Sequence, residues 1–135
     1  MNIAICLDDR NGMLFCGRRQ SQDSVQRQQL LQLSQPGDLW MNSYSAKQFA
    51  DGDAICVAED FLQTAGQGAW CFVENTDVRP YKEKIEYIAI YRWNRLYPSD
   101  VKFPVEAFSE SWQQVSSRTF PGSSHDEITE EIYRL

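Results

Sequence analysis

Short apolar runs alternate with more polar segments along the first half of the chain. The runs that predict strands are residues 2–7, 38–42, 54–58 and 69–73, with a further short apolar stretch, Met13–Cys16, after an Asn-Gly turn. The segments that predict helices run from Ser21 or Asp23 to Ser34, from Ser45 to Ala50 and from Glu59 to Ala65. Strands that are apolar throughout must be covered on both faces, so this alternation predicts an α/β fold with a mainly parallel sheet flanked by helices.

The later part of the chain has a different pattern. Residues Lys84–Trp93 form the strongest predicted strand, because they are rich in aromatic and β-branched side chains. The segments Trp112–Phe120 and Ile128–Tyr133 flank a Pro-Gly-Ser-Ser turn and are expected to pair as a C-terminal antiparallel hairpin. A helix over Ile128–Leu135 is the alternative, and periodicity alone leaves both interpretations open.

Length and composition limit the classes of protein. The 135 residues match the usual size of one domain, so we expect a single domain over residues 1–135. No run approaches the roughly 18 apolar residues of a membrane span, and the first apolar run stops at Asp8-Asp9, so we expect neither a membrane segment nor a signal peptide. With 19 acidic and 13 basic residues the net charge is -6, which argues against nucleic acid as a partner.

The four cysteines, Cys6, Cys16, Cys56 and Cys71, all lie in apolar runs and form no Cys-x-x-Cys pair. This pattern is typical of small buried side chains in a reducing compartment, so we expect free buried thiols and a cytoplasmic protein. A secreted scaffold with two disulfides is the alternative.

Several kinds of catalytic chemistry have no support in the sequence. A Ser/His/Asp or Cys/His nucleophile would have to use the single histidine, His125, which lies in a predicted turn beside Asp126 and Glu127 and is expected to be a turn or surface residue. The cysteines and the histidine lack zinc-ligand spacing, so no metal site is expected. Neither a phosphate-binding P-loop nor a Gly-x-Gly-x-x-Gly dinucleotide motif is present.

Two adjacent arginines form the clearest candidate binding feature. Arg18 and Arg19 come just before the predicted N-terminus of a helix, with Ser21 close behind. Guanidinium groups and free backbone N–H groups both suit a phosphate or a carboxylate, so a site for a small anionic molecule is one interpretation. A solvated basic loop is the other.

Three further side chains lie where predicted strands or loops meet helices. Asp23 is a candidate catalytic acid or substrate anchor, or a helix cap. Ser43 and Ser45 follow a predicted parallel strand, at the edge of the sheet where ligands bind in open α/β folds. Helix capping explains these serines equally well.

The order of several short segments resembles the dihydrofolate reductase family in a shortened form. Residues 3–7 with Asp9-Arg10-Asn11-Gly12-Met13 are similar to that family's first strand and the start of its mobile loop, and residues 38–45 to its strand into Met-Gly-Arg-x-Thr. Residues 85–93, Asp100-Val101-Lys102-Phe103-Pro104, and the segments beginning at Trp112 and ending at Arg134 follow the order of its late strand, its Asp-x-x-Phe-Pro segment and its final hairpin. The resemblance implies a reductase-like mixed sheet and favours strand at the C-terminus.

The same resemblance names the family's functional positions, and this chain departs from several. Asp23 falls near the family's substrate carboxylate, and Ser45 falls where a threonine stands. Ser43 replaces the arginine that holds a cofactor phosphate, and Glu74-Asn75-Thr76-Asp77 replaces the Gly-Gly turn that the pyrophosphate approaches. Negative charge there repels phosphate, so we expect no cofactor and, in particular, no NADPH site of the family's kind.

The segment from Gly12 to Ser21 also resembles a group of short bacterial proteins that sometimes carry the label ribonuclease Z. Ribonuclease Z needs a His-x-His-x-Asp-His metal site, which one histidine cannot supply. We therefore exclude that metal-dependent activity.

The leading hypothesis is a non-catalytic module on a reductase-like fold that binds a small ligand or a partner. One alternative is an NAD(P)H-dependent reductase of the dihydrofolate reductase type, in which Asp23 anchors the substrate while Ser45 and Arg18 or Arg19 contact phosphate. The other is a structural or regulatory protein that self-associates into a homo-oligomer.

Overall fold

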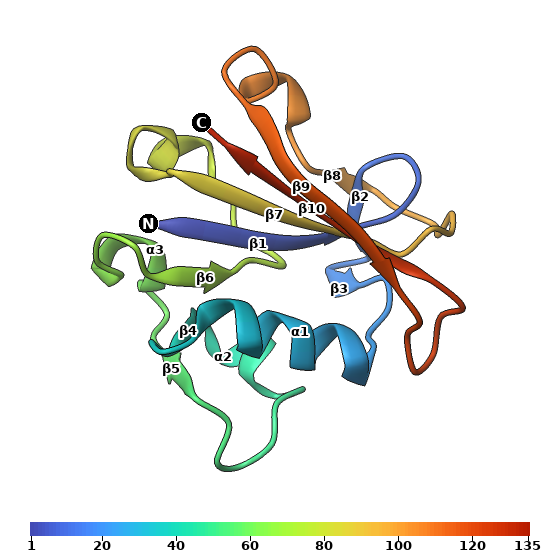
Figure 1. The fold of residues 1–135 in the computed structure, drawn as a ribbon, viewed down its shortest axis with the longest axis horizontal. Helices are drawn as coiled ribbons and strands as arrows, with labels where there is room; N and C mark the ends of the chain where they lie inside the picture. The colour runs from blue at the N-terminus through green and yellow to red at the C-terminus, as the bar shows by residue number, and fades with distance from the viewer.

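Seven strands form one sheet in the computed structural model, which describes residues 1–135 (Figure 1). In the order in which they lie side by side, the strands are β5 (Ile55–Val57), β4 (Leu39–Met41), β6 (Trp70–Phe72), β1 (Asn2–Leu7), β7 (Tyr87–Arg92), β10 (Ile128–Arg134) and β9 (Gln113–Phe120).

The sheet is parallel on one side and antiparallel on the other. β1 pairs in parallel with β6 and with β7, so that Ile3 lies between Cys71 and Ile88. β4 continues the parallel part between β5 and β6. β10 runs antiparallel to both β7 and β9. The expected α/β class with a mainly parallel sheet and a C-terminal antiparallel hairpin is confirmed, and the helical alternative for residues 128–135 is wrong.

Short helical segments connect the strands. They are α1 (Ser24–Ser34), α2 (Ser43–Ala46), α3 (Phe61–Thr64) and the 3-10 turns η1 (Arg79–Lys84) and η2 (Val105–Ala107). The longest, α1, has 11 residues and several glutamines, and no helix in the molecule has the length and apolarity needed to cross a membrane.

Apolar side chains pack on both faces of the central strand. Ile3, Ile5 and Leu7 of β1 belong to a core cluster that includes Phe61 and Leu62 of α3. Ala4 faces the other way, into a second cluster that contains Leu30 of α1, Phe72 and Tyr91. Successive residues of a strand point to opposite faces, which explains why an uninterrupted apolar run was needed here.

A second, three-stranded sheet lies at one end of the main sheet. Its order is β3 (Arg18–Arg19), β2 (Gly12–Phe15) and β8 (Val101–Lys102). The buried carboxylate of Asp8, at the end of β1, accepts hydrogen bonds from the backbone N–H of Gly12 and from Nε2 of Gln20. Asp8 therefore fastens this small sheet to the main one. The sequence pattern did not indicate β3 or β8, because each has only two residues.

Several predicted boundaries and one predicted environment differ in the structure. α2 begins at Ser43 rather than Ser45, because Asn42 caps it by accepting the backbone N–H of Ser45. Residues 84–86 precede β7 instead of belonging to it, since η1 extends to Lys84. The four cysteines are free, but Cys16 is exposed in a tight turn with φ of 51°, so the expectation that all four are buried is wrong.

Candidate functional site

Asp23 lies at the start of α1 and is its N-cap. Its carboxylate accepts the backbone N–H of Val25 at 2.9 Å and that of Gln26 at 3.1 Å. These two N–H groups have no partner inside the helix, so the carboxylate satisfies donors that the helix leaves free. The capping role considered for Asp23 is therefore confirmed.

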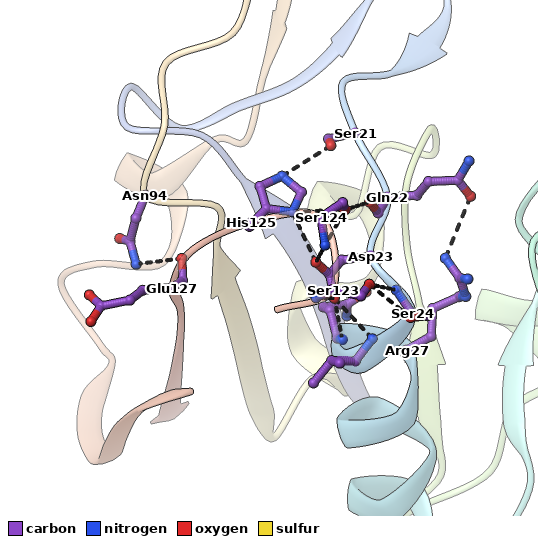
Figure 2. A network of polar contacts seen from close by, with 12 residues as sticks. Ser21, Gln22, Asp23, Ser24, Arg27, Asn94, Ser123, Ser124, His125 and Glu127 are labelled. Carbon is purple, nitrogen blue, oxygen red and sulfur yellow. Dashed lines mark hydrogen bonds and ion pairs between the residues drawn. The ribbon is translucent and has the colours of Figure 1, made fainter. Parts of the chain in front are cut away.

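The same carboxylate also holds the turn between β9 and β10 (Figure 2). It accepts the backbone N–H of Ser123 at 3.1 Å and that of Ser124 at 2.8 Å. The ring Nδ1 of His125 lies 3.1 Å from Oδ2. A carboxylate can only accept, so this contact requires a proton on Nδ1. We call Asp23, Ser123, Ser124 and His125 the clasp.

The Asp23 and His125 side chains of the clasp are buried, and their hydrogen bonds strongly favour the charged form of the acid. The side chains of His125 and Asp23 are 1% and 0% exposed. Burial alone would raise the pKa of the Asp23 carboxyl, but the hydrogen bonds from Ser124, Ser123 and His125 outweigh burial and hold that pKa well below its ordinary value. His125 lies in a turn, as expected, but not at the surface, because its side chain is buried and stacks on Trp93 with ring centroids 4.5 Å apart.

Together with Ser21, the Asp23–His125 pair has the hydrogen-bond order of a Ser/His/Asp triad, but there is no room beside Ser21 for a substrate. Ser21 Oγ lies 3.1 Å from His125 Nε2, yet the hydroxyl of Tyr97 lies closer to that nitrogen, at 2.9 Å. The one hollow that Ser21 lines has a volume of about 10 Å³, roughly enough for one water. A substrate carbonyl cannot reach Ser21 there, so we interpret the cluster as a structural clasp.

Arg19 and Ser45 come together on a carboxylate that follows β6. Arg19 forms a two-pronged ion pair with Glu74, from Nε at 2.9 Å and from Nη2 at 3.1 Å. Ser45 donates its hydroxyl to the same carboxylate at 2.8 Å, and Gln48 donates an amide N–H at 3.0 Å. The guanidinium also lies over the ring of Tyr44, 4.3 Å from its centroid. An anion could bind these groups only by displacing Glu74.

This ion pair fills the edge of the sheet where the parallel strands end. Cys6 of β1, Val73 and Glu74 after β6, and Trp93 after β7 line the remaining space together with Arg19, and that space is the hollow of about 10 Å³ that Ser21 also lines. In open α/β sheets this edge is the usual ligand site. Here it is closed by side chains.

Ser43 and Arg18 take no part in either cluster. Ser43 is exposed, and its backbone N–H donates to Glu59 at 3.0 Å. Arg18 is exposed on the small sheet, next to Phe15 of β2. The predicted site residues therefore separate into two clusters and two exposed positions. In each cluster a half-buried side chain contacts a buried group: Ser21 lies beside the Asp23–His125 pair, and Arg19 meets Ser45 at Glu74.

A groove of about 620 Å³ opens beside the closed edge, between the small sheet, the loop after β6 and the segment around η2. Its apolar side chains are Met13, Leu14, Val78, Val101, Phe103 and Val105. Its charged side chains are Arg10, Asp77, Arg79, Lys102 and Glu106. Arg79 is paired with Asp77 at 2.9 Å, which leaves Arg10 and Lys102 as cations without an ion-pair partner.

The sequence alone does not show that Glu74 and His125 are the centres of the two clusters. Glu74 was interpreted as an acid that repels phosphate, whereas it is neutralised by an arginine 55 positions earlier. No signal in one sequence indicates such a pairing. No three His, Cys, Asp or Glu side chains gather where they could hold a metal ion.

No family model matches the chain, and no curated protein is similar to it in sequence. The structure is similar to that of dihydrofolate reductase from Enterococcus faecalis complexed with NADP(H) and RAB-propyl, with a TM-score of 0.68 and 10% sequence identity. The match covers 99% of this chain and 95% of that chain. The chain has the dihydrofolate reductase fold.

The two clusters can be compared with the functional positions that the resemblance to dihydrofolate reductase implies. The resemblance noted in the sequence puts Asp23 near the family's substrate carboxylate and the loop at Glu74 at its cofactor turn. In this chain the Asp23 carboxylate accepts hydrogen bonds from the β9–β10 turn, and the Glu74 carboxylate forms an ion pair with Arg19. At 10% identity the likeness to dihydrofolate reductase shows the fold alone.

Proposed function

We propose that this chain is a binding module for a small organic anion and that it does not catalyse hydride transfer. One contrast carries the proposal. The space at the ends of the parallel strands is about 10 Å³, whereas the adjacent groove is about 620 Å³. A groove of that size is in the range that holds small ligands.

The chemistry of the groove indicates the class of ligand. Met13, Val101 and Val105 expose apolar surface that would cover a hydrophobic body, and Arg10 and Lys102 offer positive charge to a carboxylate or a phosphate. Both cations are exposed, so their contribution to affinity depends on ionic strength. We therefore expect a ligand with an apolar ring or chain and one anionic group.

A matched pair of variants tests the groove. Val101 of β8 lines it and is 44% exposed, whereas Val115 of β9 lies outside it and is 48% exposed. A panel of aromatic carboxylates and organic phosphates is screened by amide chemical-shift changes. We expect a binder that shifts amides of residues 10–14, 75–79 and 101–106. Val101→Trp fills the groove and should weaken binding about tenfold or more, while Val115→Trp changes it less than about twofold.

Three results would contradict the proposal. They are a panel with no member that shifts the groove amides, equal losses in the two tryptophan variants, and binding that is unchanged by Val101→Trp.

The fold favours a reductase as the second candidate, since the similar dihydrofolate reductase is described in complex with NADP(H). That candidate predicts that NADPH raises the melting temperature and is oxidised in the presence of dihydrofolate. The closed edge at Glu74 argues against both outcomes, because the cofactor would have to displace the buried pair with Arg19. Hydride transfer above the rate without protein would overturn the binding-only proposal.

A further inference from the structure

Exposed apolar side chains gather at the end of the molecule formed by the small sheet and the loop after β7. Of the large apolar residues that are exposed, Phe15 and Leu96 are 45% and 53% exposed and lie on either side of Tyr97 and Pro98. Scattered apolar residues are normal on a protein surface, whereas neighbouring ones around a concave surface mark contact sites.

Two hollows adjoin at this end. One, of about 500 Å³, is lined by Phe15 and Arg18 together with Tyr97 and Pro98. The other, of about 480 Å³, is lined by Leu96 together with the same Tyr97 and Pro98. Tyr97 and Pro98 therefore form the boundary between two adjacent depressions. An extended segment that crosses this boundary can place one side chain in each.

The side chains that line the two hollows carry positive charge, while Asp9 and Asp100 lie beside them, hydrogen-bonded to Arg95 and Cys16. Neither hollow has an acidic residue in its lining, although the chain carries 19 acidic residues and a net charge of -6. Arg10, Arg18 and Lys102 line the hollows, and the guanidinium of Arg95 lies 5.5 Å from the ring centroid of Tyr97. None of these four cations has an ion-pair partner.

The boundary between the hollows is held in place by buried groups. The backbone N–H of Tyr97 donates to the buried carboxylate of Asp8 at 3.3 Å, and its hydroxyl lies 2.9 Å from Nε2 of His125. The carbonyl of Arg95 accepts the backbone N–H of Asp9 at 3.0 Å. A surface that is already ordered loses less conformational entropy on binding.

We propose that Phe15, Arg18, Arg95, Leu96, Tyr97 and Pro98, the basic-apolar surface, dock an extended acidic segment of a partner protein that also carries bulky apolar side chains. Charge complementarity selects the acidic residues, and the two hollows select the apolar ones. A nucleic acid fits less well. Apart from the four cations at this end the chain has 19 acidic residues and only nine basic ones, so the rest of the molecule repels a phosphate backbone.

Selection from a library tests the chemistry of the partner without assuming its sequence. A display library of random peptides of about twelve residues is selected on the wild-type chain and depleted on the double variant Arg18→Glu, Leu96→Ser. We expect the enriched peptides to share net negative charge and at least one aromatic or leucine side chain. Enrichment of basic or uncharged peptides, or no enrichment, would overturn the proposal.

Single variants then locate the site with one labelled, enriched peptide. Arg18→Glu and Phe15→Ser should each raise its Kd about fivefold or more, and binding should weaken as salt is added. Lys47→Glu and Val115→Ser are matched controls, because both residues are exposed and lie outside the hollows, and each should change Kd less than about twofold.

Equal effects of test and control variants would overturn the proposal, as would tighter binding of a single-stranded oligonucleotide than of the peptide. Arg10 and Lys102 line both the hollow of about 480 Å³ and the groove of about 620 Å³, but the varied residues Phe15, Arg18 and Leu96 all lie outside that groove. If the peptide-docking test fails, the proposed small-anion function is unaffected. If the small-anion test fails, the proposed docking surface is likewise unaffected.

Discussion

Replacing Asp23 with alanine should release the turn between β9 and β10 from the start of α1. The N-cap contributes about 1 kcal/mol, and the Nδ1–H of the buried His125 would exchange its charged acceptor for Ser124 Oγ, 3.2 Å away, at a cost of about 2 kcal/mol. The N–H groups of Ser123 and Ser124 lie in an exposed turn, where water replaces most of what the carboxylate supplied, leaving about 1 kcal/mol lost.

The expected loss of unfolding free energy is therefore about 4 kcal/mol, or about 14 °C in melting temperature for a chain of this size. Denaturant and thermal unfolding at pH 7 measure it. Asp60→Ala is the matched control, because Asp60 is the N-cap residue of α3 but makes no side-chain cap hydrogen bond. That control should stay within about 0.5 kcal/mol of the wild type.

The pH dependence of the difference in unfolding free energy between wild type and Asp23→Ala gives a second test of the clasp. The pKa of Asp23 is lower in the folded chain than its ordinary value, so its contribution is complete above an unfolded pKa of about 4 and is lost as the pH falls further. The gap between wild type and Asp23→Ala should therefore narrow as the pH falls below about 4. A gap under about 1 kcal/mol at pH 7, or one that widens in acid, would refute the clasp.

Two further predictions concern the turn and the thiols. A Cβ on Gly122 would collide with Oδ2 of Asp23, so Gly122→Ala should destabilise the fold by about 1–3 kcal/mol, whereas Gly66→Ala meets no atom within 4 Å and should be neutral or stabilising by up to about 1 kcal/mol. Equal unfolding free energies for the two variants would contradict this. Burial raises the pKa of the Cys71 thiol to about 12, so a thiol reagent at pH 8 should modify the exposed Cys16 at least about a hundredfold faster than Cys71. Comparable rates, measured by mass spectrometry of timed samples, would show that Cys71 is not shielded.

The main sheet could be predicted from the sequence because its signal is local. A strand buried on both faces must be apolar along its length, and β1 and β6 satisfy that pattern within a few residues, while the edge strand β5 is apolar in sequence although Val57 is exposed. Of the two caps predicted for α1, Ser21 and Asp23, the structure confirms Asp23, a residue type that caps helices. The resemblance to dihydrofolate reductase added the hairpin of β9 and β10, which periodicity left open.

The candidate site was harder to predict because its partners are far apart in the sequence. His125 meets Asp23 across 102 positions, and the Pro-Gly-Ser-Ser signature indicates a turn without indicating where that turn lies. Arg19 and Glu74 are likewise 55 positions apart. A sequence gives the charge of each side chain but not the partner that neutralises it. Arg19 alone therefore suggests an anion site, and Glu74 alone suggests a loop that repels phosphate.

The position of β1 in the middle of the sheet has a consequence for how the chain folds. β1 comes first in the sequence, yet its two neighbours are β6 and β7, which end at residues 72 and 92. During synthesis, more than half of the chain must therefore be made before either edge of β1 can pair with a neighbouring strand. Contacts of such long sequence separation slow folding, and an unpaired apolar strand invites aggregation. The growing chain is thus at its most vulnerable before residue 92 leaves the ribosome.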